Sequence, residues 1–410
     1  MNKKILTLTL TLTLVACAQS MERRLGDVRT DFASGEFRRQ EVGDRNLDPL
    51  LAGNKLFQQG QYNRADEVLE SMNIRIASSP RANIPGEVVG AVAGQMARNY
   101  TPWFMDDLFI SYYQLWAALA TGRWADARVI INQSYAKQQR LSAEYRRLLD
   151  RRERDAAGLG AHLRAENAHW QPFADIMNPA LTYLAGIYFL NFARGNNDFE
   201  TARTYLLRAD GMVPGNSKIR ADLALARARH APQNTTWIFI ESGFAPRLYE
   251  RRIDWPFATM DGVRMISIAT PGARRMTPAR RVDGAEIIAD VDRMFMTEFN
   301  EYSVNDALRA FAAAIAQLQI QRVAADQSPW LGLAATVGTF ALTSAEIRSW
   351  VTLPQHISVI RKTTPTDGLI PIKSGGNVLT TLTVPSGQNN LVYIRKVDNN
   401  IITTKIITLN

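Results

Sequence analysis

The sequence predicts an α+β fold: an N-terminal domain of helical repeats, then a mixed α/β region and a small C-terminal β-rich module. Residues 47–232 are rich in Ala, Leu and aromatic residues with few β-branched runs, and one short turn motif recurs within them. From about residue 235 onward, β-branched runs alternate with Gly, Pro, Asn and Asp clusters. A chain of 410 residues is long enough for two or three hydrophobic cores.

The chain starts with a short apolar segment. Lys3 and Lys4 precede the 12-residue run Ile5–Ala16, in which Leu and Thr alternate. Alternation is a strand signal, but a positive start before a short apolar run is typical of a secretory signal. The run is too short for a membrane-spanning helix, which needs about 20 residues. We therefore predict that residues 1–16 are a signal peptide.

The segment ends Leu14-Val15-Ala16-Cys17, and Cys17 is the only cysteine of the chain. These residues resemble the lipobox of bacterial lipoproteins, which implies cleavage between Ala16 and Cys17 and acylation of Cys17 with chains such as palmitate. Each buried methylene contributes about 0.8 kcal/mol, so several acyl chains anchor a protein stably. Ala18 follows instead of Asp, which implies the outer membrane, facing the periplasm. An ordinary buried cysteine is the alternative.

Residues 17–46 are polar and charged without a clear period, which predicts a lipidated tether. The net charge is +9, or +7 once Lys3 and Lys4 leave with the signal (9 − 2), so anionic partners are favoured. Because a secreted protein rarely meets nucleic acid, we expect a membrane surface or cell-wall polymer rather than nucleic acid. Basic residues concentrate at 137–155 and 273–281, where a solvated helix face and a flexible loop are the simplest interpretations.

Three copies of one motif mark turns within the helical domain of residues 47–232. Each copy has a turn former, a polar residue, an aromatic residue, two further residues and Ala. Gly or Asn permits the left-handed conformation that ends a helix, and Ala lets two helices approach closely. The aromatic residue is expected to pack into the bend of the hairpin. The residues assigned to this packing are Gly60, Tyr62, Ala65, Gly122, Trp124, Ala127, Asn197, Phe199 and Ala202.

The motif resembles the inter-helix turn of tetratricopeptide repeats, and Leu206, Ala209 and Pro214 extend the match after the third copy. The copies are 62 and 75 residues apart, whereas such repeats have a period of about 34. We therefore predict a degenerate tetratricopeptide-like domain, with a generic helical bundle as the alternative. The aromatic-rich stretch Tyr100–Trp124 is expected to line a groove or to pack in the core.

Residues 233–354 are predicted to form an α/β domain with strands before a helix. The apolar stretch Trp330–Ala345 is too short to span a membrane, which leaves a buried helix or an envelope-inserting segment. The expected elements are strands at Thr236–Glu241 and Val263–Ile268, a turn at Ser242–Pro246, an alternating segment at Arg247–Phe257 and a helix from Ile287 to about Asp326.

Residues 355–410 are predicted to form a β-rich module, either a small sandwich or a sheet packed on the preceding helix. Turn clusters rich in Gly, Pro, Asn and Asp separate its β-branched runs. The expected strands are His356–Arg361, Val378–Val384, Leu391–Val397 and Ile401–Leu409.

Several segments together resemble a family of uncharacterised proteobacterial outer-membrane lipoproteins with a tetratricopeptide-like N-terminal half. They are the lipobox, the Gly122 turn, Ile240–Pro246 with Arg251–Pro256, and Ala345–Pro354. The chain departs from that family's usual phrases at Phe244, Ile347 and Val351. The resemblance carries no established activity. It implies an envelope role, because such proteins are often encoded beside cell-wall-synthase activators.

The sequence shows no catalytic motif that predicts an enzyme. Neither a metal-binding spacing nor a phosphate loop, dinucleotide fingerprint or nucleophile elbow is present, so no cofactor is expected. Glu241, Arg252 and Asp254 are expected to form a salt-bridge network, and Arg348 with Trp350 a stacked pair. The histidines are His162, His169, His230 and His356.

These observations predict a lipid-anchored envelope protein that binds a partner protein as an adaptor or scaffold, in cell-wall or outer-membrane assembly. Repeat surfaces are commonly used in this way. One alternative is an envelope hydrolase acting on cell-wall polymer, which two carboxylates in one pocket would favour. The other is a structural subunit of an envelope complex, which a stable oligomer would favour.

Overall fold

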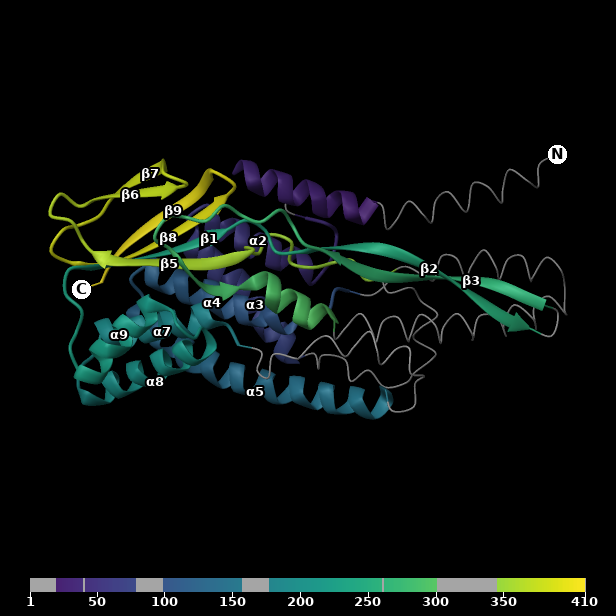
Figure 1. Cartoon of the computed structure of the whole chain (residues 1–410), viewed down its shortest axis with the longest axis horizontal. Coiled ribbons are helices and arrows are strands. Elements are labelled where there is room, and N and C mark those ends of the chain that lie inside the picture. Colours follow the sequence, from purple (N-terminus) through teal and green to yellow (C-terminus); the bar gives the residue numbers. More distant parts are fainter. Residues whose placement is uncertain are drawn as a thin grey trace.

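The computed structural model describes residues 20–39, 41–78, 99–156, 177–259, 262–300 and 345–409. In these ranges, helices cover one face of a five-stranded sheet, and a small β-hairpin covers the other face (Figure 1). The predicted α+β class is therefore confirmed. None of the described helices combines the length and the apolar character needed to cross a membrane.

The sheet has the strand order β4-β5-β1-β8-β9, and β1 in its centre is antiparallel to β5 and parallel to β8. Alternation along β1 directs Trp237 and Phe239 to the helices, and Ile238 and Ile240 to the hairpin β6–β7. Because both faces are covered, β1 is buried along its whole length. The strands are β1 Thr235–Ser242, β4 Glu286–Asp290, β5 His356–Thr363, β6 Leu369–Ser374, β7 Asn377–Thr383, β8 Asn389–Val397 and β9 Asn400–Leu409.

This topology corrects the expected boundary between residues 233–354 and 355–410. Strands from both sides of residue 355 pair within one sheet, so the two segments form a single unit. The four strands expected after residue 355 are present, with β6 in addition. Residue 287, where a helix was expected to begin, lies in β4, and the helix starts at residue 291. Its predicted continuation, and nearly all of the apolar stretch that follows, fall within 301–344, outside the described residues.

The helices form consecutive hairpins whose first members lie against the sheet. Nearly every residue of α4 and α7 is buried, whereas α5 and α8 lie farthest from the sheet (Figure 1). The pairs are α2 Leu47–Gln58 with α3 Tyr62–Ser78, α4 Phe104–Ala120 with α5 Trp124–Ala156, and α7 Pro179–Asn191 with α8 Asn196–Met212, followed by α9 Ser217–Ala228.

The aromatic stretch Tyr100–Trp124 forms core rather than groove. The Trp116 ring on α4 lies 5.4 Å from Phe239 of β1 and 5.2 Å from Tyr393 of β8. Trp116 and its neighbour Tyr112 are fully buried. The inner face of the hairpins is therefore covered by the protein's own sheet, and a partner has no access to it while the layers stay together.

Two glycines allow the helices of a hairpin to approach closely. A Cβ on Gly53 would lie 2.6 Å from the Cδ2 atom of Leu69, and a Cβ on Gly186 would lie 2.7 Å from that of Leu206. Such distances are too short for packed carbon atoms. The first and third hairpins therefore use the same contact, between a glycine on one helix and a leucine on the next.

Gly186→Ala is expected to destabilise the protein by about 1–3 kcal/mol, because the new methyl group overpacks the contact with Leu206. Gly211→Ala is the matched control. Gly211 lies in α8, where an added methyl group would meet open space, so alanine should stabilise the helix by up to about 1 kcal/mol. Urea unfolding measures both changes, and equal effects of the two variants would contradict the packing argument.

Part of the expected tether of residues 17–46 is a docked helix instead. Residues 20–34 are helical, and their apolar side chains Leu25, Val28 and Phe32 are buried at helical spacing. Asn400 of β9 also donates a hydrogen bond to the Ala33 carbonyl, at 3.1 Å. The chain is therefore held on the body from residue 20 onward. One arginine is buried on the same face as these apolar side chains.

That arginine, Arg29, fixes the helix to the body. Its Nε donates to the Val351 carbonyl at 2.9 Å, one Nη donates to the Ala245 carbonyl, and the other contacts the Met276 sulfur at 3.0 Å. Its guanidinium also lies over the Phe244 ring, 5.3 Å from the centroid. The helix is thus linked to three segments that lie more than 200 residues away in sequence.

A long two-stranded ribbon projects from the sheet (Figure 1). It consists of β2 Arg247–Thr259 and β3 Gly262–Arg274, which pair with each other from Arg247↔Arg274 to Thr259↔Gly262. The alternating segment and the following strand predicted here are confirmed.

Candidate functional site

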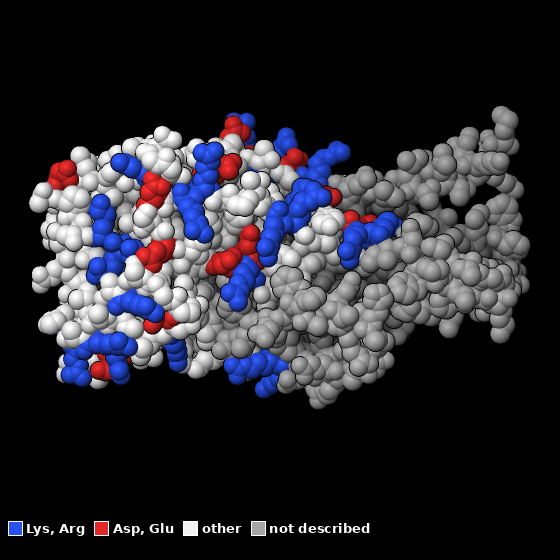
Figure 2. Space-filling model, viewed as in Figure 1, with Lys and Arg blue, Asp and Glu red and all other residues white. Residues whose placement is uncertain are grey.

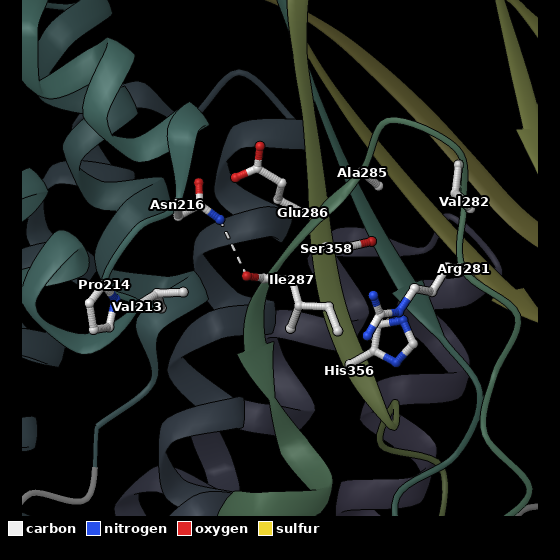
Figure 3. Close-up of a pocket in the computed structure, with 10 residues that line it drawn as sticks. All are labelled: Val213, Pro214, Asn216, Arg281, Val282, Ala285, Glu286, Ile287, His356 and Ser358. Carbon is white, nitrogen blue, oxygen red and sulfur yellow. Dashed lines mark hydrogen bonds between the residues drawn. The ribbon is translucent and has the colours of Figure 1, made fainter.

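A pocket with a volume of about 310 Å³ lies where the turn between α8 and α9 meets the β4 edge of the sheet (Figure 3). The edge strand, the loop before it and the neighbouring strand β5 supply the other walls. The lining residues are Val213, Pro214, Asn216, Arg281, Val282, Ala285, Glu286, Ile287, His356 and Ser358.

Two polar residues of this pocket hold its walls together. Glu286 accepts hydrogen bonds from the backbone N–H and hydroxyl of Ser217 and forms an ion pair of 3.3 Å with Lys218. Asn216 caps α9 through its side-chain oxygen, and its amide nitrogen donates to the Ile287 carbonyl at 3.3 Å. Both side chains therefore fix α9 to the sheet edge.

The other polar residues give the pocket donor character. The Arg281 guanidinium is exposed and has no ion-pair partner among the described residues. Burial, together with the positive charges of Lys396 and Arg281, lowers the pKa of His356 to about 4, so its imidazole is neutral at pH 7. With the Ser358 hydroxyl these groups suit a small anion such as a carboxylate or a phosphate.

A second polar cluster lies between the layers, around Glu241 of β1 and Arg395 of β8. The two residues are register partners, both are fully buried, and Nε of Arg395 lies 3.7 Å from Oε2 of Glu241. The hydroxyls of Tyr393 and Tyr113 donate to the same carboxylate oxygen at 2.8 and 3.1 Å. Gln58 of α2 donates to Tyr393 at 2.8 Å, so the cluster connects two helices with the sheet.

Burial raises the pKa of Glu241 to about 7, although the Arg395 charge and the tyrosine hydroxyls act in the opposite direction. Its Oε1 atom has no hydrogen-bond partner in the described part of the chain. Arg395 donates to the Lys396 carbonyl at 3.0 Å and to the Thr352 carbonyl at 3.3 Å. The cluster is thus a buried junction whose charge changes near neutral pH.

The expected network of Glu241, Arg252 and Asp254 is not formed as predicted. Glu241 pairs with Arg395, whereas Arg252 forms an ion pair of 3.0 Å with Glu250 on its own strand. The reason is that β1 lies in the sheet interior, while β2 leaves the sheet. The Asp254 side chain, Ala16, Cys17, His162 and His169 lie outside the described residues.

Arg348 and Trp350, expected to stack on each other, connect separate segments. Arg348 forms an ion pair of 2.5 Å with Asp44 and a second one with Glu346. The Trp350 ring lies 5.9 Å from that of Tyr113 on α4. The segment containing Arg348 is therefore fixed both to the residues before α2 and to the helical core.

The first two copies of the turn motif have the expected backbone. Gly60 has φ +76° and Gly122 has φ +71°, and both follow the end of a helix. The Tyr62 ring packs edge-on against Phe57 of the preceding helix at 5.2 Å, and Ala65 is fully buried. Tyr62 thus fills the bend of its hairpin.

In other respects, the second and third copies of the motif differ from this pattern. Trp124 packs against Phe192, which follows α7, at 4.8 Å, and so connects two hairpins. Asn197 was expected to end a helix, but it lies in the first turn of α8, after Gly195 as the N-cap. The remaining residues assigned to the turns are buried or half-buried in the helical core: Ala127, Phe199 and Ala202.

Sequence reasoning missed Asp222, a fully buried carboxylate on α9. It accepts hydrogen bonds from the Tyr183 hydroxyl at 2.6 Å, the Trp237 indole at 2.7 Å and the Arg361 guanidinium at 2.6 Å. Its partners come from α7, β1 and β5, so no local spacing in the sequence indicates the site.

Searches against protein-family models, curated proteins and solved structures found no match for this chain.

Proposed function

We propose that the protein is a lipid-anchored protein of the outer membrane that faces the periplasm and acts as an interaction scaffold. The lipobox-like residues before Cys17 support the anchor, and the resemblance to outer-membrane lipoproteins supports the compartment. The observation that carries the proposal is that the chain is already helical at Ser20, only three residues after Cys17. An extended chain spans about 3.5 Å per residue, so an acylated Cys17 would hold the body within about 10 Å of the bilayer.

The scaffold role rests on the outer helices of the hairpins, which we interpret as degenerate tetratricopeptide-like repeats. Their inner helices contact the sheet, so the surface left for a partner is formed by α3, α5 and α8. Among the described side chains, each of these helices exposes one large apolar residue: Ile74 (62%), Val129 (52%) and Leu207 (40%). Helical repeats commonly bind proteins through such extended surfaces, so an envelope protein is the proposed partner.

The hydrolase alternative predicted two carboxylates facing one pocket. The pocket at the β4 edge contains one, Glu286, which is paired with Ser217 and Lys218. The second alternative, a structural subunit, would appear as a stable oligomer of this chain on purification.

Affinity capture from detergent-solubilised envelopes tests the scaffold proposal. Ile74→Glu, Val129→Glu and Leu207→Glu combined in one chain should abolish capture of a specific partner. The matched control is Leu369→Glu with Val378→Glu, which changes exposed apolar residues of β6 and β7 and should leave capture intact. Equal capture by both variants would contradict a binding surface on the outer helices.

Membrane fractionation of Cys17→Ala tests the anchor separately. The wild-type chain should sediment with the outer membrane, and Cys17→Ala should be released in soluble form, because acyl chains hold it there. Equal sedimentation of the two chains would contradict the lipid anchor. It would not affect the proposed partner surface, which the capture experiment tests.

A further inference from the structure

Four exposed arginines lie at the end of β3 and in the loop that leads to β4: Arg274, Arg275, Arg280 and Arg281. We call residues 274–281 the arginine loop. None of the four forms an ion pair within the described parts of the chain, although Arg274 lies over the Tyr249 ring at 5.3 Å. Figure 2 shows Lys and Arg side chains, with some Asp and Glu among them, beside the base of the β2–β3 ribbon.

The arginine loop is fixed to the body, which corrects its interpretation as a flexible loop. The Met276 sulfur contacts Arg29, and the Ala279 N–H donates to Gln355 Oε1 at 2.6 Å. Lys396 donates to the Arg280 carbonyl at 2.9 Å. Because the backbone is held in place, binding of an anion by these arginines would carry no entropic cost for ordering the loop backbone.

The positive charge extends into the protein behind the loop. The guanidinium groups of Arg29 and Arg395 lie on the Phe244 ring, each 5.3 Å from its centroid. Burial and the positive charges of Arg247 and Arg395 lower the pKa of Arg29 to about 9, which leaves it a cation at neutral pH. Arg29 therefore adds a positive charge behind the loop, close to Arg247 and Arg395.

The nearby carboxylates form no ion pair with the loop arginines in the described part of the chain, although the Arg275 charge acts to lower the pKa of Asp292. Asp283 accepts hydrogen bonds from the backbone N–H groups of Gly375 and Gly376, at 3.0 and 2.9 Å. Asp292 accepts one from Gln355 at 3.0 Å, and Glu286 is held by α9. The loop arginines therefore remain available to an external anion.

We infer that the arginine loop binds the anionic phospholipid headgroups of the membrane that carries the anchor. This inference rests on the proposed anchor for its location. Arg29, which contacts the loop at Met276, is nine residues from Ser20, or about 14 Å along a helix. The chain between Ser20 and Cys17 adds about 10 Å when it is extended. Together these two lengths place the loop within reach of the bilayer surface.

The test is vesicle co-sedimentation of full-length Cys17→Ala, so that the acyl chains do not contribute. The chain should bind vesicles containing phosphatidylglycerol, fail to bind pure phosphatidylcholine, and lose affinity as salt is added. Arg275→Gln with Arg280→Gln should weaken binding about 30-fold, at roughly fivefold for each arginine near an anionic surface. Arg64→Gln with Arg227→Gln, exposed arginines of α3 and α9, is the control and should leave binding unchanged.

Equal affinity for both kinds of vesicle, or an unchanged affinity of the Arg275/Arg280 variant, would overturn the inference. So would binding to a soluble anionic wall polymer without binding to phosphatidylglycerol. Because every chain in the assay lacks the acylated cysteine, a failure here is distinct from a failure of the anchor, which fractionation of wild type and Cys17→Ala reports.

Discussion

Glu241→Gln is expected to make the protein more stable at about pH 8, by up to about 3 kcal/mol, and to have a small effect near pH 5. Burial raises the pKa of Glu241 from 4.5 to about 7. Between pH 4.5 and about pH 7, the folded state therefore binds more protons than the unfolded state. The stabilising contribution of the protonated carboxyl is therefore complete below pH 4.5 and is lost as the pH rises through 7. Glutamine keeps the shape of the neutral carboxyl and removes this loss.

Chemical unfolding of wild type and Glu241→Gln across this pH range measures the difference. His356 and Asp292 also have shifted pKa values, but both chains share them, so the difference isolates Glu241. Glu241→Leu is the companion variant. It should be destabilising at every pH, because the Tyr113 and Tyr393 hydroxyls lose their acceptor. A Glu241→Gln chain that is less stable than wild type at pH 8 would refute the account of this junction.

Arg29→Met is expected to lower the free energy of unfolding by about 3 kcal/mol or more. It should also release the helix of residues 20–34 from the body. Methionine fills a similar volume, but the buried carbonyls of Val351 and Ala245 lose their donor, at about 1–3 kcal/mol each. Hydrogen exchange should show fast exchange in residues 20–34, while the amides of β1 and β8 stay protected.

The matched control is Arg23→Met, because Arg23 is exposed on the same helix. It should leave the protection of residues 20–34 unchanged. Arg29→Lys should give partial protection, since one ammonium group cannot reach all the acceptors that the guanidinium fork contacts. Full protection of the helix in Arg29→Met would show that its apolar face alone holds it in place.

The elements that the sequence predicted correctly are those with a local signal. The run Thr236–Glu241 and the four strands after residue 355 have β-branched patterns bounded by turn residues, and they appear as strands. Gly60 and Gly122 end their helices with positive φ, as glycine permits. These features depend on neighbouring residues only.

Features that depend on distant pairing were not predictable in this way. Glu241 and Arg395 are 154 residues apart and meet only because β1 and β8 are adjacent parallel strands. The pocket likewise combines a helix cap, an edge strand and a loop, and a helix was expected to begin at Ile287, which lies in that edge strand. The spacing of Leu25, Val28 and Phe32 was a usable signal for the docked helix.

The lipid anchor depends most directly on the chemistry of Cys17, and mass spectrometry of the mature N-terminus from the native host tests it. We predict an N-terminal peptide that starts at Cys17, without residues 1–16, and carries a thioether-linked diacylglycerol with an N-acyl chain. A chain that begins at Met1 with a free Cys17 thiol would contradict the anchor, and with it the location assigned to the docked helix and the arginine loop.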